Sequence, residues 1–153
     1  MEGVKEMEKT VFEQIIDGEA PAEVVFEDDR VMAIMDIFPM NPGHCLVIPR
    51  RHAVGLSDLD PADGARMFAV AQRLASVLRS VIGGCEGVNL FLADGAVAGQ
   101  EVMHVHLHVL PRMCEDGIRF SRKRKPPAES HSKVSAAELA AQIRTSIALD
   151  SIA

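Results

Sequence analysis

The stretch QEVMHVHLHVLPR, residues 100–112, places His104, His106 and His108 at alternate positions with apolar residues between them. Successive side chains of a β-strand point to opposite faces, so this pattern predicts a strand with one apolar face and one face of three imidazoles. Residues 104–108 thus contain half of the chain's 6 histidines. We therefore assign the apolar face to the core and the imidazole face to a candidate site.

The segments around this row predict an α+β domain with an antiparallel sheet of about five strands and helices on one side. Besides the histidine stretch, the predicted strands are residues 23–27 and 31–37, which form a hairpin, 44–49, whose continuous apolar run predicts a central strand, and 87–93. Two main helices are predicted. One covers residues 9–17, and the other runs from Asp60, as the N-cap, and Pro61 to Gly83-Gly84, with a buried stripe of Met67, Val70, Ala71, Leu74, Val77, Leu78 and Val81. A capping box of Ser135 and Glu138 predicts a C-terminal helix to about Leu149. We place the domain core at residues 1–113, followed by an extension at 114–153 with a basic run at 119–125.

The composition is typical of a globular domain and argues against a nucleic-acid-binding or membrane-spanning protein. The 153 residues are 48% hydrophobic and 25% charged, as in an ordinary globular domain, and the net charge of −6 makes binding to nucleic acid or an anionic membrane unexpected. No apolar run approaches the ~20 residues that span a bilayer. Three cysteines without CxxC spacing and a polar N-terminus predict reduced thiols and a cytoplasmic location.

Three interpretations of the histidine row compete on residue chemistry alone. It is a solvent-facing strand edge, a metal site, or a nucleophilic site acting on phosphorus. At a rise of ~3.3 Å per residue the outer two histidines lie ~13 Å apart, so all three cannot bind one zinc ion. Two of these histidines, together with His44 or His52, could still bind one zinc ion. Imidazole is also a neutral nucleophile near physiological pH, and flanking imidazoles can donate hydrogen bonds to phosphate oxygens.

Longer stretches around the row resemble the histidine triad (HIT) family. Residues 99–112 match the signature His-φ-His-φ-His-φ-φ, where φ is apolar. The loop at 94–99 and the segment DIFPMNPGHCLVIPRRH at 36–52 are similar to the family's small-residue loop and upstream motif. Segments 15–21 and 27–29 extend the likeness, which covers about residues 9–113.

The resemblance implies a five-stranded antiparallel sheet, usually joined across a homodimer, and no cofactor. It implies hydrolysis or transfer of purine nucleoside monophosphates from phosphoramidates or dinucleoside polyphosphates. His106 attacks the α-phosphate and is transiently nucleotidylated. The other implied site residues are His104, His108 and His44 around the phosphate, Asp36 at the ribose hydroxyls, Ile34 and Ile37 at the base, and Gln100 and Glu101 at phosphate contacts.

Two departures from the family pattern qualify these expectations. Many bacterial members bind a structural zinc through an N-terminal Cys-x-x-Cys and two histidines, whereas Thr10 and Glu13 stand at the matching positions here. We therefore expect no metal. Asp94 and Glu101 place carboxylates near the expected phosphate, and this repulsion motivates the alternative of a nucleotide-binding module with little or no catalysis.

Overall fold

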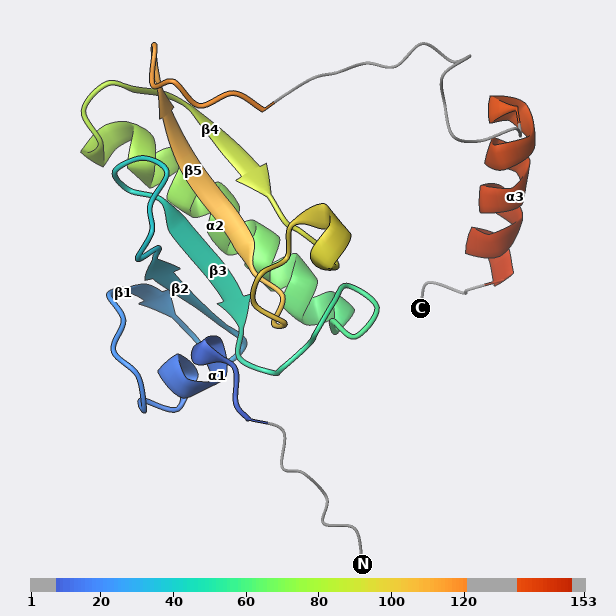
Figure 1. Cartoon of the computed structure of the whole chain (residues 1–153), viewed down its shortest axis with the longest axis horizontal. Helices are drawn as coiled ribbons and strands as arrows, with labels where there is room; N and C mark the ends of the chain where they lie inside the picture. Colours follow the sequence, from blue (N-terminus) through green and yellow to red (C-terminus); the bar gives the residue numbers. More distant parts are fainter. Residues whose placement is uncertain (1–7, 121–134, 150–153) are drawn as a thin grey trace, which may run out of the picture. The chain divides into compact units, whose positions relative to one another are not determined.

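The computed structural model describes residues 8–120 and 135–149, which fall into two units divided after Ile118. The sequence placed this boundary after residue 113. The first unit extends further because Arg112 donates hydrogen bonds to Asp116 and to the Ile118 carbonyl. In chain order the elements are α1 (Val11–Ile16), β1 (Val24–Glu27), β2 (Val31–Met35), β3 (Cys45–Pro49), α2 (Pro61–Val81), β4 (Cys85–Phe91), the 3₁₀ turn η1 (Ala96–Ala98), β5 (Leu107–Met113) and α3 (Ala136–Leu149) (Figure 1).

The five strands form one antiparallel sheet in the order β1-β2-β3-β5-β4. This confirms the predicted α+β class and the five-stranded sheet. β1 and β2 form the predicted hairpin, and β3 lies in the middle of the sheet, as its continuous apolar sequence indicated. All five residues of β3 are buried, so both of its faces are covered.

Helices cover both faces of the sheet, which corrects the prediction that they lie on one side. Alternate residues of β2 and β3 point to opposite faces. One set, including Ala33 and Val47, packs with Met67 and Val70 of α2, whereas the other set packs with Phe12 of α1. Figure 1 shows α2 behind the sheet and the short α1 in front of it. The sequence did not reveal the second covered face, because the cover depends on Phe12 packing against strands that lie far from it along the chain.

Local sequence explains where the two helices begin. The Thr10 hydroxyl accepts a hydrogen bond from the Glu13 N–H, and the Glu13 carboxylate accepts one from the Thr10 N–H, which completes a capping box at α1. Asp60 caps α2 in the predicted way, and Pro61 occupies the first helical position. Of the predicted apolar stripe of α2, Met67, Val70, Ala71 and Leu78 are buried and Leu74 is partly buried, whereas Val77 and Val81 are exposed, which corrects the prediction for those two residues.

Two strands are shorter than the sequence predicted. β2 ends at Met35, so Ile37 lies in the following loop with 76% of its surface exposed. β5 begins only at Leu107, so His104 and His106 precede the strand. Pairing of β5 with β3 stops at Leu107, because the backbone ahead of it turns away and the Val105 N–H donates to the Ala53 carbonyl instead.

The second unit contains α3, whose capping box was predicted from Ser135 and Glu138 and is present. Its apolar stripe of Leu139, Ile143 and Ile147 is at least one-third exposed within this unit. Most of the predicted basic run lies outside the described residues. No helix in the described ranges is long and apolar enough to cross a membrane.

Candidate functional site

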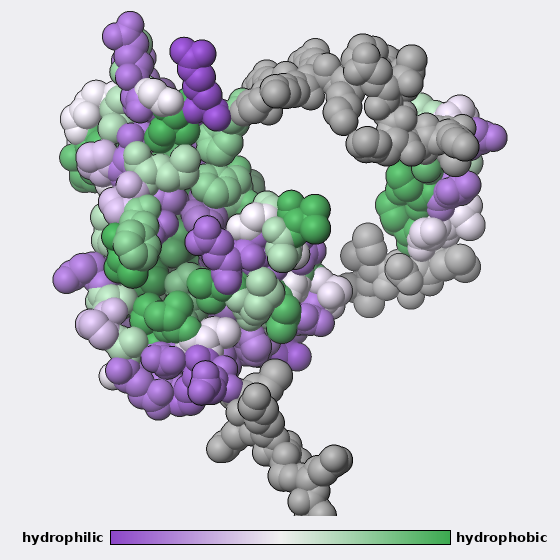
Figure 2. Space-filling model, in the orientation of Figure 1, coloured by the Kyte–Doolittle hydropathy of each residue, from purple (hydrophilic) through white to green (hydrophobic). Residues whose placement is uncertain are grey.

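A cavity of about 250 Å³ opens on the α1 face of the sheet and brings together most of the predicted site residues. On this face Figure 2 shows apolar surface gathered over the sheet between more hydrophilic borders. His106, His108, Asp36, Glu101, Ile34 and Ile37 line the cavity, together with Val11, Phe12, Ile15, Pro21, Ala22, Met35, Phe38, Leu46 and Val102. The walls are thus mainly apolar, with four polar groups among them.

His106 is held in one tautomer by the backbone. Its Nδ1 lies 2.8 Å from the carbonyl oxygen of His104. A carbonyl only accepts, so Nδ1 must carry the ring proton. The remaining nitrogen, Nε2, therefore has a lone pair and no hydrogen-bond partner among the described residues. The edge of the Phe12 ring packs against this imidazole, with ring centroids 5.2 Å apart. His106 thus offers an oriented nitrogen nucleophile to the cavity.

His44 and His108 form a hydrogen-bonded chain that starts at a backbone N–H. The Met40 N–H donates to His44 Nδ1 at 3.2 Å, which leaves the ring proton on Nε2. His44 Nε2 then donates to His108 Nδ1 at 3.0 Å. His108 must therefore carry its proton on Nε2. The Phe91 ring stacks on His108, with centroids 4.2 Å apart and planes 9° apart, and fixes the ring plane. His108 thus supplies an N–H donor beside the His106 lone pair.

Asp36 lies at the junction of the cavity and this chain. Its Oδ2 is 3.5 Å from His44 Nδ1, and its Oδ1 accepts the Phe38 N–H at 2.9 Å. The carboxylate is largely covered, with 15% of the side chain exposed, yet it still lines the cavity. It is therefore placed to accept hydrogen bonds from hydroxyl groups of a ligand.

His104 does not share the cavity with the other two histidines, which corrects the prediction of one imidazole face. It is fully buried, its Nε2 donates to the Pro49 carbonyl at 2.8 Å, and its Nδ1 lies 3.5 Å from the Thr10 hydroxyl. The backbone turn ahead of β5 breaks the period of two on which the prediction relied. His104 acts through its own carbonyl, which orients His106.

Gln100 has a structural function that the sequence did not indicate. Its Nε2 donates to the Val54 and Val102 carbonyls, and its Oε1 accepts the Gly95 N–H. These bonds tie the loop at 94–99 to the loop after β3. Both ends of the side-chain amide are thus already engaged in hydrogen bonds. A contact of Gln100 with phosphate stays a prediction.

The two atypical carboxylates point to different places. Asp94 Oδ1 lies so close to Gly55 that a side chain at that position would collide with it, and Asp94 is not part of the cavity wall. Glu101 does line the cavity. Repulsion of a bound phosphate therefore concerns Glu101 and not Asp94.

Side chains beneath the site were missed by the sequence interpretation. Asp116, with 5% of its side chain exposed, accepts two hydrogen bonds from the Arg112 guanidinium and one from Asn41 Nδ2. Asn41 also donates to the Pro111 carbonyl, and its own carbonyl accepts the His44 N–H. This cluster therefore anchors the loop that carries His44. In the sequence, the signals of this cluster were the Asn-Pro-Gly turn at residues 41–43 and Arg112.

Among the residues that the structure describes, two groups of side chains could hold a cation. In the first, ligand atoms of Glu13, His52 and His104 lie within 4.8 Å of one another. His52 Nε2 already donates to the Met103 carbonyl, and Glu13 accepts the Thr10 N–H. The group offers three donors, whereas structural zinc sites close with four. We retain the expectation that no structural zinc is bound.

The second group is Asp36, His44 and His108, which satisfies the same distance criterion. His108 Nδ1 already accepts a hydrogen bond from His44 Nε2, so a cation bound through that nitrogen would break this bond.

Stability is expected to fall as the pH drops from about 6.5 to about 4. Burial is the main cause that lowers the pKa of His108 from 6.5 to about 4, and burial also lowers the pKa values of His44 and His104. The folded state therefore keeps these rings neutral at pH values where the unfolded chain binds protons. Their stabilising contribution is complete above about pH 6.5 and is lost as the pH falls toward 4.

Urea unfolding at several pH values between about 8 and 4.5 measures this loss. The midpoint should be constant above about pH 7 and decrease below it. A midpoint that stays level down to about pH 5 would contradict the neutral, buried state of these histidines, because carboxylates titrate lower.

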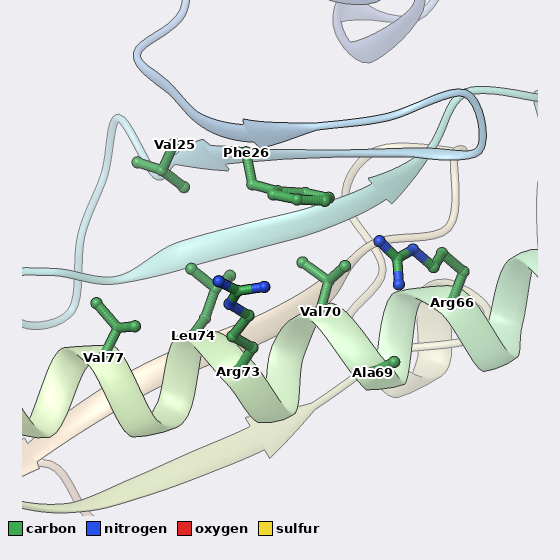
Figure 3. Close-up of a pocket in the computed structure, with 8 residues that line it drawn as sticks. All are labelled: Val25, Phe26, Arg66, Ala69, Val70, Arg73, Leu74 and Val77. Carbon is green, nitrogen blue, oxygen red and sulfur yellow. The ribbon is translucent and has the colours of Figure 1, made fainter.

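A second hollow, of about 340 Å³, lies on the opposite face between β1 and α2. Figure 3 shows Phe26 facing α2 across it, with Arg66 and Arg73 on the helix. The Arg66 guanidinium lies 5.6 Å from the Phe26 ring centroid and is paired with Asp28. No histidine, cysteine or hydroxyl group lines this hollow. The candidate for chemistry is therefore the histidine cavity.

Comparisons with known proteins agree on one family. A family model described as HIT domain matches residues 17–114. An uncharacterized HIT-like protein from Borreliella burgdorferi is 40% identical over 75% of this chain and 84% of that protein. An adenylylsulfatase from Arabidopsis thaliana is 35% identical over 69% of this chain and 53% of that protein. The crystal structure of a HIT family protein from Bacillus anthracis aligns with a TM-score of 0.75 at 34% identity, over 91% of this chain and 94% of that one.

Proposed function

This chain belongs to the histidine triad family, and from that membership we propose that it is a nucleotide hydrolase or transferase in which His106 forms a covalent nucleotidyl intermediate. One observation carries the proposal. The backbone fixes the proton of His106 on Nδ1, so its Nε2 lone pair is available in a cavity that also holds the His108 N–H. A nucleophile beside a donor is the pair that transfer of a phosphorus group needs.

In the proposed complex the cavity divides among the parts of a nucleotide. The base lies against the apolar walls at Ile34 and Ile37, and the Asp36 carboxylate accepts hydrogen bonds from the ribose hydroxyls. The α-phosphate then lies between His106 and His108. We keep these three residues as proposed binding groups because their positions in the cavity suit those parts in size and polarity.

The proposed reaction proceeds in two displacements. The His106 Nε2 lone pair forms a bond to phosphorus while the bond to the leaving group breaks, the His108 Nε2–H donates a hydrogen bond to a phosphate oxygen, and the leaving group takes any proton it needs from solvent. The nucleotidylated imidazole is positively charged, and its Nδ1–H remains bonded to the His104 carbonyl, which stabilises that charge. Water then attacks phosphorus, loses a proton to solvent and releases the nucleoside monophosphate and free His106.

His44 supports this cycle through its hydrogen bond to His108. That bond fixes the tautomer of His108, so that its Nε2–H stays directed at the phosphate oxygens through both displacements. The Asp36 carboxylate, 3.5 Å from His44, opposes negative charge on this pair of rings, so neither ring gives up its proton. His104, His108 and His44 thus have separate tasks in the proposal: His104 orients the nucleophile, His108 donates a hydrogen bond to phosphate, and His44 orients that donor.

A substrate panel tests the proposal. The candidates share an adenosine monophosphate part and differ in the leaving group. This group is a simple amine, the lysine of an adenylylated lysine, the nucleoside di- or triphosphate of a dinucleoside polyphosphate, or sulfate, as the name of the Arabidopsis relative suggests. We expect turnover of at least one, with radiolabel on protein after rapid quench, unchanged by a chelator. Tight binding without label or turnover would instead favour a nucleotide-binding module. Loss of activity with chelator, together with stoichiometric zinc, would favour a metal-dependent hydrolase.

Two further expectations belong to this proposal. In the described sheet β1 and β4 are the outer strands, each paired on one side. A free outer edge is where the homodimer implied by the resemblance can extend the sheet. Cys45, Cys85 and Cys114 are all free, in keeping with the proposed cytoplasmic location.

A further inference from the structure

The charges around the histidine cavity are unusual for a site that receives phosphate. The charged groups in its wall are Asp36 and Glu101, and no lysine or arginine of the described residues lines it. The hydrogen-bond donors that the wall offers to phosphate are imidazoles and backbone N–H groups. Sites for polyphosphates normally add cationic side chains that neutralise several negative charges. This cavity therefore disfavours a substrate with a highly charged polyphosphate group.

Glu101 is the carboxylate in this wall without an assigned task. Asp36 is fixed by the Phe38 N–H and by its proximity to His44. Glu101 makes no hydrogen bond or ion pair with any residue in the described ranges, and it is exposed at the cavity. Its backbone is nevertheless held in place, because the preceding Gln100 side chain is buried and bonded at both ends. A free carboxylate on a fixed backbone is available to a ligand.

We propose that Glu101 determines specificity for the charge of the leaving group, so that amine leaving groups are favoured over phosphate or sulfate. This inference rests on the proposed function of His106. Both residues line the same cavity, and Asp36 already occupies the part assigned to the ribose. Glu101 is thereby assigned to the part of the cavity that receives the other substituent of the α-phosphorus.

The chemistry of the two kinds of leaving group explains the preference. The nitrogen of a phosphoramidate takes a proton from solvent before its P–N bond breaks, so this nitrogen carries positive charge until the electron pair of the breaking bond neutralises it. The departing amine then binds a further proton and becomes an ammonium ion at neutral pH. A nearby carboxylate stabilises this developing positive charge. A departing phosphate or sulfate gains negative charge instead, and the same carboxylate opposes it.

The experiment compares two substrates that share adenosine monophosphate: an adenosine phosphoramidate of a primary alkylamine and diadenosine tetraphosphate. The variant is Glu101→Gln, which keeps the shape and removes the charge. Asp94→Asn is the matched control, because it changes net charge equally on a neighbouring loop outside the cavity. The measured quantity is the ratio of kcat/KM for the two substrates.

We expect Glu101→Gln to shift this ratio roughly tenfold toward diadenosine tetraphosphate, and Asp94→Asn to shift it less than about twofold. The shift should shrink as salt is raised toward about 1 M, since screening weakens exposed charges. An unchanged ratio, or an equal loss for both substrates, would overturn the role of Glu101 and leave the proposed function standing. Failure of the unchanged protein to turn over any member of the substrate panel would overturn the proposed function itself.

Discussion

His106→Ala is expected to reduce turnover of an adenosine phosphoramidate by roughly 10⁴-fold or more while leaving the fold intact. Removal of a covalent nucleophile has effects of this size because no other group can form the intermediate. His108 carries its proton on Nε2, and His104 is engaged at Pro49 and buried outside the cavity. Neither can substitute as a nucleophile. The variant should also lose all radiolabel transferred to protein on rapid quench.

A matched histidine variant separates chemistry from folding. His52 lies outside the cavity wall, and its Nε2 donates to the Met103 carbonyl. His52→Gln should therefore keep turnover within a few-fold, although it removes an imidazole in the same way. Adenosine monophosphate should bind His106→Ala with a dissociation constant within a few-fold of the unchanged protein. Near-normal turnover by His106→Ala would refute a covalent mechanism at this residue.

The sequence predicted the fold well where local patterns decide the outcome. The apolar run of β3 placed it at the centre of the sheet, and Asp60 with Pro61 marked the first turn of α2. These are short-range effects of burial and capping, which a single sequence carries. The α1 face was missed because its cover depends on Phe12 packing against strands that are distant along the chain.

The sequence located the histidine row as a candidate site, but its predicted strand conformation was wrong at His104 and His106. Alternation implied three imidazoles on one face, whereas the Val105 N–H bonds to Ala53 and the strand begins only at Leu107. A hydrogen bond to a loop after β3 is a tertiary contact, so the alternation of apolar and polar residues cannot predict it. The consequence is functional, since the turn directs His106 into the cavity and leaves His104 to orient it.

Tautomers are likewise fixed by contacts that sequence does not contain. The proton on His106 Nδ1 follows from the carbonyl of His104, and the proton on His108 Nε2 follows from the Met40 N–H by way of His44. Residue types alone allow either nitrogen to be the nucleophile. The resemblance named the nucleophile, and the backbone geometry gives a physical reason for it.

Asp116→Asn is expected to lower the melting temperature by roughly 5 °C, because it weakens several hydrogen bonds to a charged group while its ion-pair partner Arg112 is partly exposed. The Asp116 side chain is 5% exposed and accepts hydrogen bonds from Arg112, Asn41, and the Met113 and Ile118 N–H groups. These bonds, with Arg112 first, hold the pKa of this carboxyl far below its usual range. Its contribution is thus complete above about pH 4 and is lost in stronger acid, below the range in which the histidines titrate.

The neighbouring Glu115 provides the matched control, because it is exposed and Glu115→Gln changes net charge by the same amount. That variant should melt within about 2 °C of the unchanged protein, as exposed charges contribute little. Asp116→Asn should also reduce kcat several-fold well below its melting temperature. Its partner Asn41 accepts the His44 N–H, so a loosened loop displaces the histidine that donates to His108. A large fall in melting temperature with kcat unchanged would mean that the cluster stabilises the domain without positioning His44.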